Sequence, residues 1–331
     1  MSGVISSTAP DSGAQTFRFS TDTISPRDRV AVWHDVLHRR FMQLETQLLS
    51  DDMVYRNVGV RFASLGIIAA ESSAIRIART RSTLSDGNDW VRIVMLRPGS
   101  GAATITQGKR EFTLGPGQAY VVSNADPHTM VYPRYMRILA LVLNRAVLRP
   151  LLRDVDSMLL RPIPQNVEAL GLLAAYSGML VRQPPDTADV SHLSVDHVFD
   201  LAALAVGATR DAAHVAETRG LRAARLNAIK SDALKNLASP HLSIDDVAVR
   251  LRISPRYIQL LFQDEDTTFS EFVLRQRLRR AWRMLTNPNL ADRSITSVAF
   301  DCGFGDSSYF NRTFRRQYGC TPSDARTSMS I

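Results

Sequence analysis

The chain has 331 residues, with 40 Lys and Arg against 32 Asp and Glu, a formal net charge of +8, and 45% hydrophobic residues. This composition is typical of a globular protein with two domains and excludes a largely disordered chain. Two cysteines, Cys302 and Cys320, are too few for a disulfide framework, so we expect a reducing compartment, the cytoplasm. The N-terminal sequence lacks the segments of a signal peptide, and no apolar run approaches the ~20 residues of a spanning helix, so we expect no membrane partner.

The positive charge is concentrated in the last third of the chain. Residues 221–331 hold 17 basic and 11 acidic residues, a net charge of +6, whereas residues 1–220 have a net charge of +2. Of the 17 basic residues, 15 are arginines, which bind phosphates and guanine edges with two hydrogen bonds at once. The charge suits either a nucleic-acid partner or a solvated basic surface, and charge alone leaves both open.

Short strands are expected in the first half of the chain. Residues 1–16 are small and polar and predict a mobile tail. A helix is expected after Ser25, with Pro26 at its first position and Trp33 on its apolar face. Runs of β-forming residues then alternate with Gly- and Pro-rich turns, which predicts a small β-barrel or sandwich. The expected strands cover residues 54–60, 74–80, 91–96, 102–106, 118–122 and 136–143.

Two helical patterns follow, at about residues 166–182 and 192–214, with a proline-rich break between them. The first has an apolar stripe that includes Leu173 and Tyr176, and the second has one that includes Val198. Either a dimer interface or packing on the barrel of the same chain explains these stripes, and the sequence leaves both open.

The segment 243–264 has the pattern of a helix–turn–helix motif. Ser243 and Asp246 can form a capping box at the start of its first helix. Ser254 can cap the second helix, which has Pro255 at its first position. The intervening turn is three or four residues long, as in DNA-binding motifs of this kind.

The second helix of this motif separates two kinds of side chain. Its apolar residues face inward, and the opposite face consists of Arg256, Gln259, Leu260 and Gln263. A recognition helix requires this division, because it anchors in its domain on one side and reads base edges on the other. Arginine suits guanine and glutamine suits adenine.

The same pattern recurs at residues 294–317, where Asp306 can cap the second helix. Its outward face is expected to consist of Ser308, Asn311, Arg312, Arg315 and Arg316. A long helix, opened by Thr268 and Glu271 in capping-box relation, joins the two motifs. Being continuous, it can hold the two recognition helices about one turn of DNA apart, ~34 Å.

Two segments of the chain resemble a known family. Residues 299–322 read AFDCGFGDSSYFNRTFRRQYGCTP, and residues 254–262 read SPRYIQLLF. Both segments resemble the DNA-binding domain of the AraC/XylS family of transcription regulators. The N-terminal part resembles, more weakly, the AraC-binding-like cupin barrel of that family, including the turn at residues 115–117.

The resemblance implies an α+β protein of two domains. After the tail, residues 17–215 would form a cupin-like regulatory and dimerisation domain, and residues 216–331 the DNA-binding domain. It further implies a bacterial cytoplasmic regulator, an activator that binds double-stranded promoter DNA as a homodimer and contacts RNA polymerase. The residues expected to contact DNA are Ser254, Arg256, Tyr257, Gln259, Leu260, Gln263, Ser307, Ser308, Tyr309, Asn311, Arg312, Arg315 and Arg316.

The first motif departs from the family pattern at three positions. Arg252 and Asp266 stand where the family usually has glycine, which reaches positive φ without steric cost. An arginine in that conformation costs about 1–2 kcal/mol. Leu260 stands where the family often has a basic residue, so it either reads a thymine methyl group or leaves a phosphate contact missing. We therefore expect the second motif to be the stronger reader.

An enzyme and a nonspecific nucleoid protein are the competing interpretations. A cupin enzyme holds its metal with about three protein ligands, whereas residues 54–143 contain one histidine, His128. We therefore expect no catalytic residues, no metal and no cofactor. A nucleoid protein would bind all DNA equally with a steep salt dependence, whereas the polar outward faces of the two helices favour specificity.

A barrel without a metal can still hold a small effector. The candidate residues for effector binding are Trp90, Arg92, Tyr120, His128 and Tyr135. A register error of one residue reverses the face on which each side chain lies, so packing in the core or exposure at the surface is the alternative for each of them.

Overall fold

The structure is a computed structural model that describes residues 4–8, 13–40, 42–152, 154, 158–159, 161–164, 167–209, 212–213, 220–290 and 292–327, without the side chains of residues 4–8 and 37–40. The chain forms two compact units, Met1–Ala224 and Arg225–Ile331. The sequence analysis placed the domain boundary between residues 215 and 216, whereas the two units divide within helix α6 (Gly220–Lys235). The expected α+β fold is confirmed, with a sheet-rich N-terminal unit and a helical C-terminal unit.

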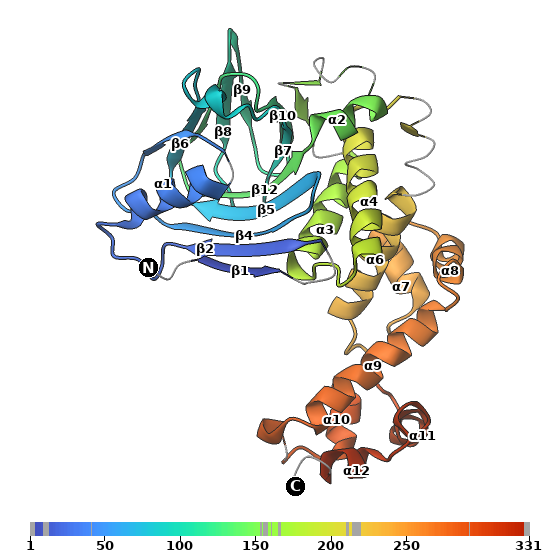
Figure 1. Ribbon diagram of the computed structural model, residues 1–331. Helices are drawn as coiled ribbons and strands as arrows, with labels where there is room; N and C mark the ends of the chain where they lie inside the picture. The colour runs from blue at the N-terminus through green and yellow to red at the C-terminus, as the bar shows by residue number, and fades with distance from the viewer. Residues whose placement is uncertain are drawn as a thin grey trace. The chain divides into compact units, whose positions relative to one another are not determined.

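Two antiparallel sheets form most of the N-terminal unit (Figure 1). The larger has the order β1 (Val4–Thr8), β2 (Gln15–Ser20), β4 (Tyr55–Arg61), β5 (Leu65–Ser72), β12 (Met136–Leu143), β7 (Val91–Leu96), β10 (Ala119–Ser123) and β13 (Pro162–Ile163). The smaller has the order β3 (Glu45–Leu48), β6 (Ile75–Arg79), β11 (His128–Tyr132), β8 (Ala103–Gln107) and β9 (Arg110–Leu114). Side chains of both sheets, such as Val94 and Tyr120 of the larger and Ile105 and Met130 of the smaller, share one core.

The six expected strands correspond to β4, β6, β7, β8, β10 and β12, each within one residue at either end. The sequence analysis missed β1, β2, β3, β5, β9, β11 and β13. Strand β5 contains two alanines and a glycine, which have low strand propensity, and its place is set by its neighbours β4 and β12.

The N-terminal tail predicted over residues 1–16 is wrong for residues 4–8, 15 and 16. Their backbone groups pair in the antiparallel ladder of β1 and β2, and β2 continues this ladder with β4. Residues 1–3 and 9–12 of the predicted tail lie outside the described residues. The first helix, α1 (Arg29–Arg40), begins three residues after Pro26, because residues 26–28 form a turn in which the Asp28 amide donates to the Ser25 carbonyl (2.9 Å).

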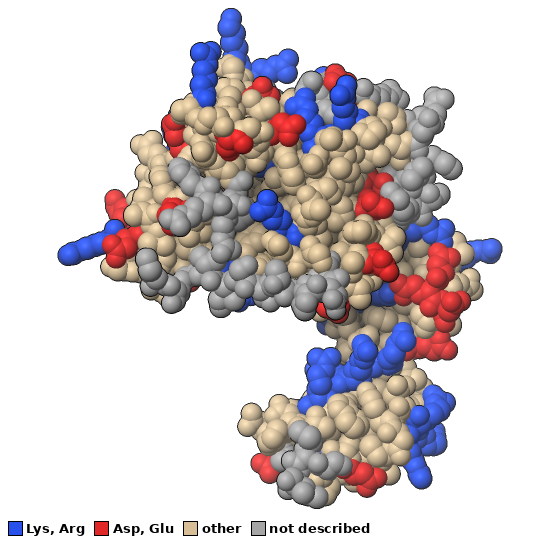
Figure 2. Space-filling view, viewed as in Figure 1, with Lys and Arg blue, Asp and Glu red and all other residues tan. Residues whose placement is uncertain are grey.

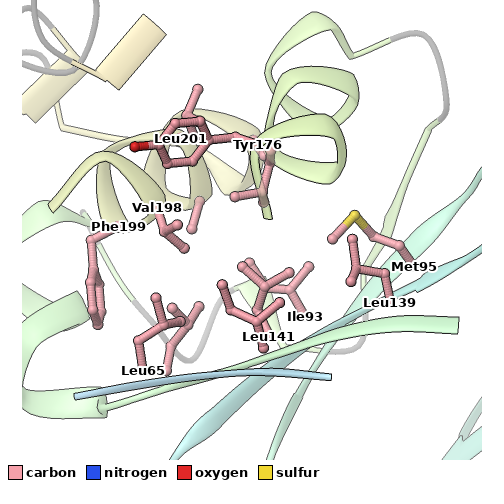
Figure 3. Close-up of a cluster of buried hydrophobic side chains, with 14 of the residues drawn as sticks. Leu65, Ile93, Met95, Leu139, Leu141, Tyr176, Val198, Phe199 and Leu201 are labelled. Carbon is pink, nitrogen blue, oxygen red and sulfur yellow. The ribbon is translucent and has the colours of Figure 1, made fainter. Parts of the chain in front are cut away.

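Helices α3 (Glu168–Arg182) and α4 (Ala188–Val206) cover the outer face of the larger sheet (Figures 1 and 3). Figure 3 shows Tyr176 and Val198 of these helices above Ile93 and Leu141 of β7 and β12, and all four are buried in one core. Most of the apolar stripe residues on both helices therefore pack on the barrel of their own chain, which decides between the two interpretations left open by the sequence. Alternate residues of β7 point to the two sides, so Ile93 faces the helices while Arg92 and Val94 face the barrel interior.

The C-terminal unit contains seven helices among the described residues. They are α6, which begins in the preceding unit, α7 (Ile244–Leu251), α8 (Pro255–Gln263), α9 (Phe269–Leu285), α10 (Ile295–Asp301), α11 (Ser307–Tyr318) and α12 (Pro322–Thr327). One core joins α6, α7, α8 and the start of α9, and another joins the rest of α9 to α10, α11 and α12. Helix α9 thus contributes to both cores and connects them with continuous backbone.

Short elements complete the fold. They are η1 (Thr83–Asp86), α2 (Arg145–Leu148), η2 (Arg149–Leu151) and η4 (Pro288–Leu290).

Candidate nucleic-acid interface

The first helix–turn–helix motif consists of α7 and α8. Ser243 and Asp246 form the expected capping box, and the Ser254 hydroxyl accepts from the amide of Tyr257 (3.2 Å) at the start of α8. The Asp246 carboxylate accepts from Ser243, and this hydrogen bonding lowers its pKa. Both helices thus begin where the capping residues in the sequence predict.

Helix α8 has the predicted division of faces. Ile258, Leu261 and Phe262 are buried, whereas the predicted contact residues Ser254, Arg256, Gln259, Leu260 and Gln263 are exposed. Tyr257 is half-buried, and its hydroxyl accepts from Nη1 of Arg225 (3.3 Å) while its ring lies under the same guanidinium. Tyr257 therefore packs within the unit more than the sequence analysis expected.

The second motif consists of α10 and α11. The Asp306 carboxylate accepts from the amide of Tyr309 and caps α11, with Phe310 and Phe314 buried below. Ser307 is half-buried. The other predicted contact residues, Ser308, Tyr309, Asn311, Arg312, Arg315 and Arg316, are exposed.

The turns of the two motifs differ in their backbone chemistry. Arg252 (φ 55°) and Asp266 (φ 51°) have positive φ, as the sequence analysis expected for positions that usually hold glycine. The counterpart of Arg252 in the second motif is Gly303, at φ 88°. A Cβ atom at Gly303 would lie 2.4 Å from the carbonyl oxygen of Leu237, so only glycine fits there.

Arg277 of α9 links the two halves of the unit, a role that the sequence analysis missed. Its guanidinium donates to the carbonyl oxygens of Leu237 (3.2 Å) and Ser239 (2.6 Å) in the segment that follows α6, and it lies beside Gly303. Partial burial lowers its pKa. The sequence showed no difference between Arg277 and the exposed arginines Arg275 and Arg279 of the same helix.

Charge is unequal between the two motifs. Residues 243–267 hold five acidic residues and three arginines, whereas residues 294–318 hold two acidic residues and three arginines. Helix α9 adds five arginines and one glutamate. Figure 2 shows blue side chains over the part of the C-terminal unit that contains α9 and α11, and red side chains near α7 and α8. The less acidic surroundings of the second motif therefore suit DNA phosphates better than those of the first motif.

Cys302 lies in the core below the second turn, as expected for a small buried hydrophobe. Burial raises its pKa to about 11, and its Sγ lies 3.7 Å from Sδ of Met284. The thiol is therefore protonated at neutral pH and is a poor nucleophile or metal ligand.

The effector candidates divide between the barrel interior and its surface. Trp90 and Arg92 line a cavity of about 250 Å³, and His128 hydrogen-bonds Arg92 (2.7 Å). Tyr120 is fully buried in the core, where its hydroxyl lies 2.9 Å from that of Tyr132. Tyr135 does not line this cavity; it is 40% exposed and donates to Glu71 (2.6 Å) at the surface. The sequence analysis missed other cavity residues, such as Trp33 of α1 and Asn88 of the segment before β7, because only the fold brings these segments to the cavity.

No cluster of three potential metal ligands occurs among the residues that the structure describes. Within the same part of the chain, no helix combines the length and the hydrophobicity needed to cross a bilayer.

Comparison with known proteins finds a family match in each of the two units. A family described as an AraC-binding-like domain matches residues 33–206, and one described as a helix-turn-helix domain matches residues 247–328. The chain is 37% identical to the transcriptional activator RhrA of Rhizobium meliloti over 187 residues, 56% of each chain. It is 24% identical to the transcriptional activator NphR of Rhodococcus sp. over 80% of this chain and 78% of NphR.

The aligned segment spans about half the length of RhrA and 40% of the Msm operon regulatory protein of Streptococcus mutans. The crystal structure of the AraC-like transcriptional activator CuxR is 20% identical, with a TM-score of 0.47 over 80% of this chain and 94% of that chain. Since the AraC-binding-like match alone covers more than half of the residues, this chain belongs to the AraC family of transcription regulators.

Proposed function

We propose that the protein is a sequence-specific transcription regulator that reads two adjacent major-groove segments of double-stranded promoter DNA. The observation that carries the proposal is the pair of capped helices α8 and α11, each with a buried apolar face and an exposed polar face, connected through α9. Helix α9 is continuous between the two, and we expect them to contact half-sites about one helical turn apart.

The exposed faces supply side chains for base and phosphate contacts. Arg256 and Gln259 on α8, and Asn311 and Arg312 on α11, have the donors and acceptors that pair with guanine and adenine edges. The exposed arginines of α9 and Arg315 and Arg316 of α11 suit phosphates. Ser254, Tyr257, Leu260, Gln263, Ser307, Ser308 and Tyr309 complete the proposed contact set.

The remaining parts of the proposal rest on the family and on the names of relatives. Both RhrA and NphR are named transcriptional activators, which supports activation and contact with RNA polymerase. The N-terminal barrel would sense a small effector and support a homodimer in the cytoplasm. The chain would have no enzymatic activity.

Selection from random duplex DNA, followed by footprinting, tests the proposal. We expect two enriched half-sites about one turn apart. One half-site would mean that one motif reads bases, and we expect that motif to be α10–α11. The selection is then repeated with residues 217–331 alone. If both selections give salt-sensitive binding to every sequence and no enrichment, the result would support the nonspecific nucleoid protein and overturn the proposal of a sequence-specific regulator.

A substitution on α11 tests whether Arg312 contacts the bases of the selected site. Arg312→Ala should weaken binding to the selected site by about 1–3 kcal/mol and relax preference at one or two base positions. Lys235→Ala removes an equal charge from an exposed position at the end of α6, outside both motifs, and is the control. Dissociation constants for the selected site and for its single-base variants measure the affinity and the base preference of both protein variants. An equal loss on all sequences would contradict base reading by Arg312.

A further inference from the structure

The cavity between the two sheets of the N-terminal unit has an apolar wall and one buried cation. Its volume is about 250 Å³, and its lining includes Trp33, Tyr55, Ile68, Met136 and Ile138, with Arg92 among them. Trp33 and Tyr55 are buried, with ring centroids 5.3 Å apart. Such a surface favours the apolar body of a small molecule, and Arg92 is the buried cation beside it.

Arg92 occupies a position where a strand of a barrel usually carries an apolar side chain. It lies on the inner face of β7, in register with Val122 of β10 and Val142 of β12, and is 8% exposed. Its one hydrogen bond among the described residues runs from Nη2 to Nε2 of His128 (2.7 Å), and its Nε is buried without a partner. A guanidinium has five N–H donors, so most of its capacity is unused by the protein.

The partner of Arg92 carries no negative charge. Nδ1 of His128 lies 2.8 Å from the carbonyl oxygen of Asp126, which fixes the proton on Nδ1 and leaves Nε2 as the acceptor. Burial lowers the pKa of His128 to about 3, so the imidazole is neutral at pH 7. Burial also lowers the pKa of Arg92, but a guanidinium keeps its proton at neutral pH. No carboxylate in the described part of the chain forms an ion pair with Arg92.

A second buried arginine in the same unit, Arg79, has its charge compensated by a carboxylate, as is usual for buried charges. Arg79 of β6 is 1% exposed and makes six hydrogen bonds, two of them to the carboxylate of Asp86 (2.8 and 2.5 Å). Its charge is therefore compensated within the protein. A buried charge without such a partner is costly, and Arg92 lies beside an open volume where a partner can enter.

We propose that this cavity binds a small molecule with one carboxylate and an apolar body, and that Arg92 is the residue that pairs with the carboxylate. The proposal rests on the function proposed above for the barrel, since it names the chemical class of the effector. A cavity of about 150 Å³ holds a benzene ring, so about 250 Å³ accommodates a single ring or short chain together with the carboxylate. A free inorganic anion would leave the apolar wall uncovered.

Thermal unfolding of the full chain tests the chemical class. The probes are cyclohexanecarboxylate and hexanoate, each compared with its neutral amide, and inorganic phosphate at equal ionic strength. At least one carboxylate should raise Tm by about 5 °C when it is present at a hundredfold excess over its Kd. The amides and phosphate should leave Tm unchanged. An equal shift with an amide and its carboxylate, or no shift with either carboxylate, would overturn the proposal.

Two variants test the residue. Arg92→Met should abolish the response to carboxylate or weaken binding by 10- to 100-fold, and without ligand its Tm should equal or exceed that of the unmodified protein. Arg92→Gln keeps a donor for His128 and removes the charge, so it should lose the response in the same way. The ligand-free Tm of both variants reports that they fold.

Arg61→Met is the matched control, because Arg61 also lines the cavity but is exposed to solvent. This variant should keep the response to carboxylate. A response that survives Arg92→Met and Arg92→Gln but disappears in Arg61→Met would overturn the assignment of Arg92. The assay contains no DNA, so its outcome is independent of whether α8 and α11 read promoter sequence.

Discussion

Arg252 and Asp266 are the non-glycine residues with positive φ in the described part of the chain. Both flank the first recognition helix, and both were identified from the sequence because glycine is usual at these positions. The sequence indicated the conformation here through its resemblance to the AraC/XylS family, which usually has glycine, a residue that reaches positive φ without steric cost, at both positions. Aspartate tolerates that region better than arginine, so Arg252 has the larger strain.

Replacement of Arg252 should therefore stabilise the C-terminal unit. Arg252→Gly is expected to raise its free energy of unfolding by about 0.5–1 kcal/mol, because relief of strain exceeds the added entropy of the unfolded chain. Differential scanning calorimetry of the full chain measures the shift. Gly303→Ala is the opposite control and should destabilise by about 2–3 kcal/mol, since its Cβ would overlap the Leu237 carbonyl. A loss of stability in Arg252→Gly would show that the arginine side chain makes a stabilising contact.

At the scale of elements, the segment from the end of β6 to the start of β7 depends on the ion pair between the buried Arg79 and Asp86. Arg79 binds the carbonyl oxygens of Thr83 and Asn88 and the carboxylate of Asp86, and so fixes the segment that contains η1. The sequence predicted a turn near these residues but did not indicate that Arg79 is buried and paired, because the sequence around Arg79 does not distinguish it from the exposed arginines nearby. Only the fold buries its side chain and brings its partners to it.

Hydrogen bonds from Arg79 hold the pKa of Asp86 far below its usual range. The stabilisation is therefore fully present above the unfolded pKa, about 3.9, and is lost as the pH falls below that value. Asp86→Asn should lower the free energy of unfolding of the N-terminal unit at pH 7 by about 3 kcal/mol, because it leaves a buried guanidinium without its anion. Urea unfolding at several pH values measures this. The difference from the unmodified protein should shrink below pH 4, and a constant difference would contradict the ion pair as its source.

At the scale of the whole molecule, α4 leaves an apolar surface uncovered. Val190 and Leu193, nearly one turn apart at its start, are 51% and 53% exposed, whereas most of the stripe residues predicted for a dimer are buried in their own unit. We expect the proposed homodimer to use this exposed start of α4. Leu193→Asp should then convert the dimer to monomers in light scattering at micromolar concentration.

The control for this change is Val249→Asp on α7, which adds the same charge at a position 77% exposed in the other unit. It should leave the oligomeric state unchanged. A dimer that persists in Leu193→Asp would place the interface elsewhere on the molecule.

The sequence by itself determined the helix starts of the two helix–turn–helix motifs and the exposed faces of their second helices, and the resemblance to the AraC/XylS family indicated the strained turn at Arg252. The starts and the faces depend on local chemistry: a capping hydroxyl or carboxylate, or a period of 3.6 residues. The tertiary structure decided which side of β7 Arg92 faces, that Arg79 is compensated while Arg92 is not, and that Arg277 joins α9 to α6. Those features depend on strand register and on partners 7 to 45 residues away along the chain, which no local pattern specifies.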